Sequence, residues 1–150
     1  MRLALYQPDI PQNTGTLMRS CACLDIALDI IEPCGFLFSD RSLRRSGMDY
    51  IEHLNMIRHN SWEDFKEYHS KGRIILMTTK TDIAYTDFEF QPDDILMAGR
   101  ESAGVPKDVH DAIPHHVTIP MHSQTRSLNI AIASTMILGE ALRQTKGTKK

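Results

Sequence analysis

Three polar stretches each lie between a short apolar run typical of a strand and a longer run typical of a helix. They are rich in Asn, Gly and Ser, and they read PQNTGTLMR (11–19), LMAGRESAGVP (96–106) and IPMHSQTRSLNIAIAS (119–134). In open α/β folds, ligands bind where such loops gather outside the carboxyl ends of the strands. Three such stretches in a chain of 150 residues therefore predict one ligand site at one end of a sheet.

The rest of the chain alternates between the same two kinds of run. Strands are expected at 2–6, 28–31, 73–78, 95–98 and 116–119, with a weaker candidate at 50–54. Helices are expected at 14–24 after an Asn13 or Thr14 cap, at 40–46 before Gly47, at 61–69 after a Ser61 cap, from Pro106 onwards and at 128–144. Strands that alternate with helices favour a parallel sheet covered by helices on both faces. The sequence therefore predicts an α/β fold in a single domain, 1–150, with a frayed basic tail at about 145–150.

Composition excludes several classes of protein. No apolar run approaches the roughly 20 residues that span a bilayer, and the apolar start is too short for a signal peptide. We therefore expect a cytoplasmic protein without membrane contact, whose three cysteines are free thiols. The net charge of −2 excludes a generally basic nucleic-acid coat, so any polyanion must bind a local patch.

The last expected helix is apolar around most of its circumference. Its apolar residues are Leu128, Ile130, Ala131, Ile132, Ala133, Met136, Ile137, Leu138, Ala141 and Leu142. A helix of this kind is buried on several sides, and a domain this small cannot cover all of them itself. The sequence therefore predicts a homodimer that buries the outer side of this helix.

Familiar catalytic and metal motifs do not fit the polar stretches. The glycines of GRESAG (99–104) are too widely spaced for a dinucleotide fingerprint, and no Gly-Lys-Ser/Thr ending of a phosphate loop follows. Arg100 stands where a nucleophile elbow needs glycine. Cys21 and Cys23 lack zinc-ligand spacing, and the adjacent His115 and His116 face opposite ways on a strand. We therefore expect no metal.

The motif residues can instead form a pocket rich in backbone groups. Gly99 and Gly104 let main-chain donors and acceptors approach a ligand, although a tight loop alone would also explain them. Apolar Ile119 beside polar Ser127 and Asn129 suits a flat heteroaromatic ring such as adenine.

Arginines accompany these motifs. Arg41, Arg44 and Arg45 share one face of the helix expected at 40–46, and Arg19, Arg100 and Arg126 lie in or beside the polar stretches. Guanidinium groups match phosphate geometry, so a nucleic-acid site is one interpretation and a solvated charged face is the other.

The order and spacing of the three motifs carry a family resemblance. Asn13, Gly15 and Arg19 form N-x-G-x-x-x-R, residues 96–106 form L-M-x-G-x-E-x-x-G-x-P, and I-P-M (119–121) is followed by R-S-L-N (126–129). Together they resemble the SPOUT superfamily of RNA methyltransferases. Within it the chain is similar, over nearly its whole length, to the minimal tRNA wobble-nucleotide 2′-O-methyltransferases of the TrmL or YibK type.

This resemblance implies a SPOUT fold with a deep C-terminal trefoil knot, S-adenosylmethionine as the cofactor, no metal, and a homodimer whose active site uses both subunits. The implied cofactor-binding residues are Met77, Gly99, Glu101, Gly104, Ile119, Ser127 and Leu128. The implied reaction side consists of Asn13, Arg19 and Asn129, and the expected RNA contacts are Arg41, Arg44, Arg45 and Arg126. Because a guanidinium stays charged, Arg19 is expected to orient the ribose hydroxyl and stabilise the developing alkoxide rather than act as a base.

The implied function is methyl transfer from S-adenosylmethionine to the ribose 2′-hydroxyl of the wobble nucleotide, C34 or U34, of tRNA, with leucine tRNAs as the expected substrates. Two alternatives stay open. One is a 2′-O-methyltransferase of the same superfamily that acts at another tRNA or rRNA position. The other is an RNA- or nucleotide-binding protein without catalysis.

Overall fold

A six-stranded parallel sheet forms the centre of the computed structural model, which describes residues 1–39, 41 and 50–146. The strands are β1 (Arg2–Tyr6), β2 (Ala27–Ile31), β3 (Met56–His59), β4 (Ile74–Met77), β5 (Ile95–Ala98) and β6 (His115–Val117). The helices are α1 (Pro11–Leu24), η1 (Ile51–His53), α3 (Trp62–Tyr68), α4 (Lys107–Ala112) and α5 (Ile130–Lys146). The strand order is β3-β2-β1-β5-β4-β6, so the predicted α/β class is confirmed.

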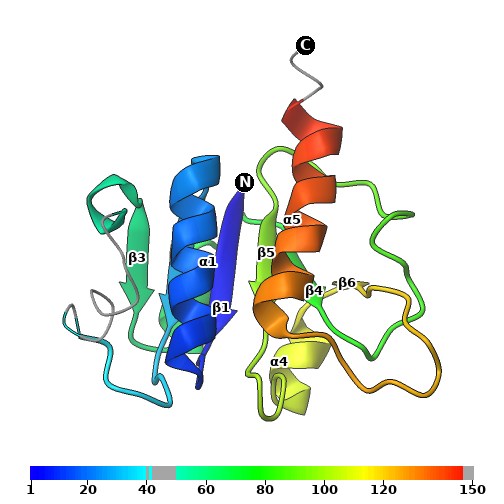
Figure 1. The fold of residues 1–150 in the computed structure, drawn as a ribbon, viewed down its shortest axis with the longest axis horizontal. Coiled ribbons are helices and arrows are strands. Elements are labelled where there is room, and N and C mark those ends of the chain that lie inside the picture. Colours follow the sequence, from blue (N-terminus) through cyan, green and yellow to red (C-terminus); the bar gives the residue numbers. More distant parts are fainter. Residues whose placement is uncertain (40, 42–49, 147–150) are drawn as a thin grey trace.

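Side chains that alternate along the strands build one core on each face of the sheet. Leu3 and Leu5 of β1 pack into a core with α1 and α5, which lie side by side in front of the sheet in Figure 1. Ala4 and Tyr6, which point the other way, pack into a core with Trp62 of α3 and with α4. Helices therefore cover both faces, as predicted.

The strand order reverses between β1 and β5. From β1 the chain builds outwards through β2 to β3, and it then crosses to β4, β5 and β6 on the other side of β1. The loops that follow β1 and β5 therefore leave the sheet side by side and diverge. This topological switch point is where open α/β sheets bind ligands.

Two helices begin at other residues than the sequence predicts. Helix α1 begins at Pro11 after Ile10, with no side-chain cap, because proline presets the backbone for a first helical turn. The expected cap at Asn13 or Thr14 is therefore wrong, and the amide of Asn13 is free for another partner. Helix α5 begins at Ile130, since the Asn129 carboxamide accepts from the backbone N–H groups of residues 131 and 132. Residues 145 and 146 belong to this helix rather than to a tail.

The bounds of other helices and strands differ from those predicted by a few residues. The weak strand candidate at 50–54 is wrong, because Leu54 bonds back to Ile51 in a 3₁₀ turn and the strand β3 follows two residues later. Pro106 is the residue before α4 rather than its first. The predicted Ser61 cap is confirmed by a bond from the backbone of Asp64. The helix expected at 40–46, with its Gly47 stop, lies outside the described residues apart from residue 41.

Within the described ranges, every helix is too short or too polar to cross a bilayer. The three cysteines are free thiols, as predicted. Burial raises the pKa of Cys21 to about 12 and that of Cys34 to about 11, so both stay protonated at neutral pH.

Candidate functional site

A cavity of about 520 Å³ opens at the carboxyl ends of β4 and β5. Its volume suits a drug-sized or cofactor-sized ligand. Segments from all three polar stretches line it. Among them is every residue predicted to bind a cofactor, namely Met77, Gly99, Glu101, Gly104, Ile119, Ser127 and Leu128. Tertiary structure thus brings together residues that the sequence spreads over about a third of its length, from 77 to 128.

The cavity has apolar walls and a backbone-rich rim. Leu76 and Ala98 close it from the sheet, and Ile130 and Ile137 close it from α5. Thr78 and Lys80 continue the lining beyond β4. Apolar walls around a few polar groups suit one face of a heteroaromatic ring, as the sequence predicts.

The rim is a tight loop after β5, residues 99–104, which we call the middle loop. Arg100 N–H donates to the Gly104 carbonyl at 2.8 Å, and Gly104 N–H donates back at 2.9 Å. Gly104 has a φ of +63°, which favours glycine. A Cβ on Gly99 would lie 2.7 Å from the Gly104 carbonyl carbon. Gly99 is therefore needed for the loop to fold back on itself, so loop closure alone accounts for glycine at this position.

The middle loop is tied to the loop after β1 by Asp9 and Glu101. Asp9 N–H donates to Glu101 Oε2 at 3.0 Å, and Glu101 N–H donates to Asp9 Oδ1 at 3.2 Å. The hydrogen bond from the Glu101 carboxyl lowers the pKa of Asp9. Burial, and after it the Asp9 carboxylate, raises the pKa of Glu101. Glu101 therefore holds its proton to higher pH than Asp9 does.

Asn13 and Asn129 meet at the mouth of the cavity. The Asn129 amide donates to Asn13 Oδ1 at 3.0 Å, across 116 residues of sequence. Both side chains line the cavity. Because the Asn129 oxygen also caps α5, its amide is fixed in orientation. Two residues of the predicted reaction side are thus held together.

Arg19, the third predicted reaction residue, lies elsewhere in this chain. Its exposed guanidinium lies 5.1 Å from the centre of the Tyr50 ring, and it is not part of the cavity lining. Arg19 follows Asn13 by six residues, which turns it to another side of α1. Arg19 therefore does not contact the cavity of its own chain, and its place on the reaction side stays a prediction.

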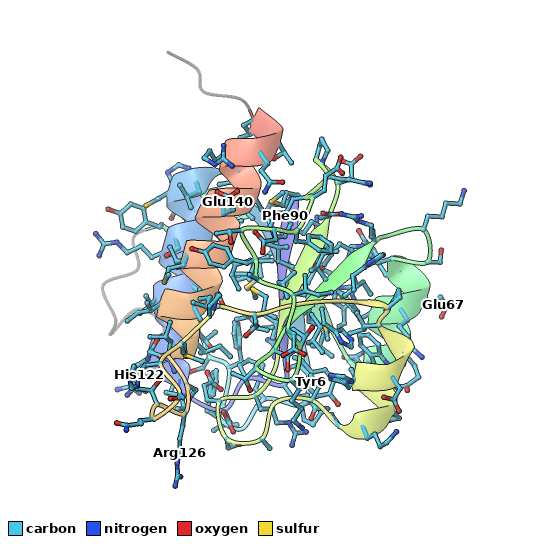
Figure 2. The ribbon with its side chains drawn as sticks, turned by 90° about the vertical axis from the view of Figure 1, so that its right-hand side faces the viewer. Tyr6, Glu67, Phe90, His122, Arg126 and Glu140 are labelled. Atoms are coloured by element: carbon cyan, nitrogen blue, oxygen red, sulfur yellow. The ribbon has the colours of Figure 1, made fainter. Side chains whose placement is uncertain are left out.

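The expected RNA contacts are exposed where the structure describes them. Arg41 is exposed, whereas Arg44 and Arg45 lie outside the described residues. Arg126 projects from the loop before α5, away from the body of the molecule (Figure 2).

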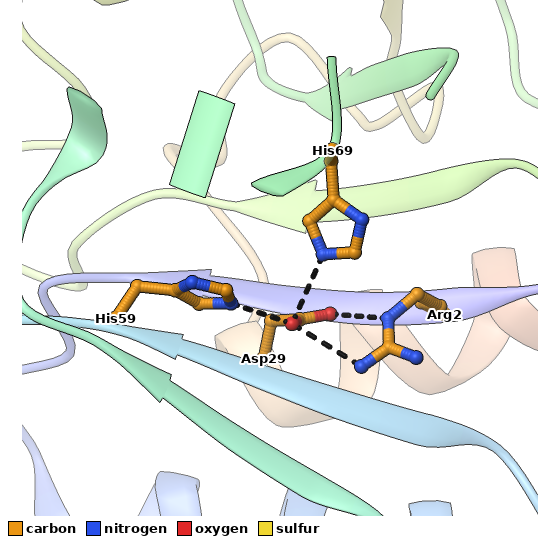
Figure 3. Close-up of polar contacts among 4 residues, drawn as sticks. All are labelled: Arg2, Asp29, His59 and His69. Atoms are coloured by element: carbon orange, nitrogen blue, oxygen red, sulfur yellow. Dashed lines mark hydrogen bonds and ion pairs between the residues drawn. The ribbon is translucent and has the colours of Figure 1, made fainter. Parts of the chain in front are cut away.

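A second group of titratable side chains surrounds Asp29 on β2, away from the cavity. Figure 3 shows the buried carboxylate among His59, His69 and Arg2. Its Oδ1 lies 2.7 Å from His59 Nε2 and 3.1 Å from His69 Nε2, and its Oδ2 lies 2.6 Å from Arg2 Nε. Because a carboxylate only accepts, both imidazoles carry their proton on Nε2. The cluster joins β1, β2, β3 and the end of α3.

Three atoms of this cluster are spaced like metal ligands, since Asp29, His59 and His69 offer donors within 4.8 Å of one another. The Arg2 guanidinium already neutralises the carboxylate, however, and it would repel a dication beside it. The hydrogen bonds therefore explain the cluster by themselves, and the absence of a metal stays a prediction.

Acidic pH should remove the contribution of Asp29 to the free energy of unfolding. Burial would raise the pKa of Asp29, but hydrogen bonds from Arg2, His59 and His69 outweigh it and lower the pKa overall. The contribution is therefore present above the unfolded pKa of about 4 and is lost as pH falls through the lower folded pKa. Asp29→Asn should lower the free energy of unfolding by about 3 kcal/mol at pH 7 and flatten this acid dependence.

Urea unfolding at pH 7 and at acidic pH measures both effects, with the exposed Asp93→Asn as the control. An Asp29→Asn protein that unfolds like the wild type at pH 7 would exclude a stabilising role for the cluster.

Sequence reasoning missed several residues of the site. Ser134 on α5 is buried in the cavity wall, and its Oγ has no partner among the described residues. A hydroxyl within the apolar first part of this helix was the available signal, although Thr135 beside it carries a hydroxyl too. Asp9 and the segment 78–80 gave no such signal, because their roles depend on which loops become neighbours.

Comparison with known proteins agrees with this geometry. The SpoU rRNA Methylase family matches residues 1–139. A protein of Beijerinckia indica subsp. indica, named tRNA (cytidine(34)-2'-O)-methyltransferase, is 54% identical over 144 residues, which cover 95% of this chain and 90% of that protein.

Two solved structures share the fold. One, described as structural insights into the 2-OH methylation of C/U34 on tRNA, has a TM-score of 0.90 at 37% identity, covering 95% of this chain and 94% of that one. The other is the SpoU methyltransferase AviRb from Streptomyces viridochromogenes in complex with AdoMet. Its TM-score is 0.85 at 26% identity, covering 96% of this chain and 60% of that one. The resemblance inferred from the three motifs is confirmed, and the chain belongs to the SpoU rRNA methylase family.

Proposed function

We propose that this chain transfers a methyl group from S-adenosylmethionine to the ribose 2′-hydroxyl of nucleotide 34 of tRNA, in the cytoplasm. The observation that carries the proposal is that all three motifs line one cavity. The name of the Beijerinckia relative and the subject of the C/U34 structure support nucleotide 34 as the target. Leucine tRNAs are the substrates we expect.

The cavity fits S-adenosylmethionine. The apolar walls suit the adenine ring, and the middle loop offers backbone groups at the rim. Ser134 Oγ is buried and has no partner in the described part of the chain, which leaves one hydroxyl available to a ligand. When bound, the cofactor supplies a sulfonium methyl that a nucleophile can attack in line.

The chain must then position the ribose hydroxyl and accommodate the negative charge that develops on it. Asn13 and Asn129 are held at the mouth of the cavity and can orient a hydroxyl by hydrogen bonds. Arg19 is assigned the charge-stabilising role. Arg41, Arg44, Arg45 and Arg126 are assigned to the tRNA phosphates.

The position of Arg19 supports a site completed by a second copy of the chain. Ile132 on α5 is 56% exposed and Met136, one turn later, is 40% exposed. Leu24, which ends the neighbouring α1, is also exposed. A two-fold interface over these helices would cover the apolar side chains and bring Arg19 to the cavity of the partner.

Light scattering at micromolar concentration should report a dimer, and Ile132→Glu should shift it towards monomer because a charge would enter the interface. Ile83→Glu, at an isoleucine 49% exposed in the loop after β4, is the matched control. A wild-type monomer that is stable and active would contradict the shared site.

We also propose that the C-terminal part is threaded as a trefoil knot. The segment between β4 and β5 bonds to Thr118, just before the last loop, through Ile83 and Tyr85. The same segment bonds to Gln144 near the end of α5 through Phe88 and Phe90. These contacts are those expected if the last loop and α5 pass beneath that segment.

Mass-spectrometric mapping of methylated nucleosides tests the function, using tRNA from cells with and without the gene. Loss of 2′-O-methylation at nucleotide 34, restored by the purified protein with S-adenosylmethionine, is the expected result. Loss at another position would favour a different target within the same superfamily. Unchanged methylation together with tRNA binding would favour a binding protein without catalysis.

A further inference from the structure

Asp9 joins three loops at the carboxyl end of the sheet. Its backbone N–H and carboxylate bond to Glu101 in both directions, and Ser102 Oγ donates to its other carboxylate oxygen. Gly35 N–H, in the loop after β2, donates to the carbonyl of Pro8, the residue before Asp9, at 2.9 Å. The loops after β1, β2 and β5 therefore meet at Pro8 and Asp9.

Gly35 of the loop after β2 packs closely against Asp9. A Cβ on Gly35 would lie 2.6 Å from the Asp9 Cβ and 2.9 Å from its Cα. The loop after β2 thus packs against Asp9, whose carboxylate accepts hydrogen bonds from Glu101 and Ser102. A residue that packs against one loop and is hydrogen-bonded to another transmits position between them.

Residues next to Asp9 in the chain and in space line the cavity. Ile10, the next residue, lines it, and so do Glu101 and Ser102 of the middle loop. One turn later on α1, Asn13 contacts Asn129. The internal bonds of the middle loop close it upon itself, but they do not fix its place relative to α1. The hydrogen bonds between Asp9 and the middle loop fix that position.

We infer that Asp9 is a positioning residue, whose carboxylate holds the middle loop against the start of α1 and thereby sets the shape of the cofactor cavity. This inference rests on the proposed function for the identity of the cofactor. Asp9 itself lies outside the cavity lining and has no role in the chemical step.

Asparagine can reproduce the hydrogen-bonding geometry of this carboxylate. Its Oδ1 can accept from Glu101 N–H, and its amide can donate to Ser102 Oγ. Alanine removes both bonds and leaves Glu101 N–H without its acceptor. The pair of variants therefore separates the hydrogen-bonding role from the charge of Asp9.

Calorimetry with S-adenosylmethionine tests the inference on the full chain. Asp9→Ala should weaken binding about tenfold or more, whereas Asp9→Asn should stay within about threefold of the wild type. Gly35→Ala, which pushes Asp9 from its place without touching the cavity, should weaken binding like Asp9→Ala. Asp93→Ala, an exposed aspartate before β5, is the control and should bind normally.

Amide hydrogen exchange provides a readout that needs no cofactor. Exchange at Glu101 should accelerate in Asp9→Ala and stay slow in Asp9→Asn, because only alanine removes the acceptor. If the wild type fails to bind S-adenosylmethionine, the proposed function fails while this exchange result still tests the contact. If the wild type binds and Asp9→Ala binds equally well with unchanged exchange, the inference is wrong and the proposed function stands.

Discussion

Gly99→Val should abolish measurable binding of S-adenosylmethionine. Even a single Cβ at this position would lie 2.8 Å from the Gly104 Cα and 2.7 Å from its carbonyl carbon, and neither backbone atom can turn aside. The middle loop must therefore open, which breaks the paired bonds between Arg100 and Gly104 and displaces the rim of the cavity. Calorimetry with the purified variant measures the loss.

Gly139→Ala is the matched control for this substitution. Gly139 lies in α5, and apart from the nearby helical backbone a Cβ there meets no atom of the described residues within 4 Å. Alanine should leave binding unchanged and raise the free energy of unfolding by up to about 1 kcal/mol, because glycine is a poor helix former. A Gly99→Val protein that binds S-adenosylmethionine as tightly as the control would remove the middle loop from the cofactor site.

Arg19→Ala should lower turnover on tRNA about 10²-fold or more while the affinity for S-adenosylmethionine changes little. The first effect follows if the guanidinium stabilises charge only in the transition state. The second follows if Arg19 contacts the ribose hydroxyl rather than the cofactor, and within its own chain Arg19 does not line the cavity. Single-turnover methylation at saturating tRNA, combined with calorimetry, separates the two. Full turnover by the variant would exclude the catalytic role.

A mixture of two inactive variants shows whether Arg19 acts on the cavity of its own chain or on that of the partner. In a mixed dimer of Arg19→Ala and Gly99→Val, the first protomer keeps an intact cavity and the second keeps its arginine. If Arg19 acts on the partner's cavity, each mixed dimer has one complete site, and an equal mixture recovers about a quarter of wild-type turnover. If it acts within its own chain, the mixture stays inactive, and the two-subunit site proposed here is wrong.

The three polar stretches show why the cavity could be predicted from the sequence. Residues such as Gly99 and Ser127 follow apolar strands, and parallel strands deliver their carboxyl ends to one edge of the sheet. The polar stretches could therefore be assigned to one site before their contacts were known. The start of α1 was predicted less well, because Pro11 overrides the capping preference of Asn13.

By itself, the sequence determined the periodic and local properties of this protein. These are the alternation of strands and helices, the two-faced parallel sheet, the Ser61 cap and the motif order that carries the family. Only the tertiary structure decided the pairings, which join residues far apart in the chain. Asp9 meets Glu101 across 92 residues, and Asp29 meets His69 across 40. Such contacts depend on strand order and loop path, which a local pattern of side chains does not encode.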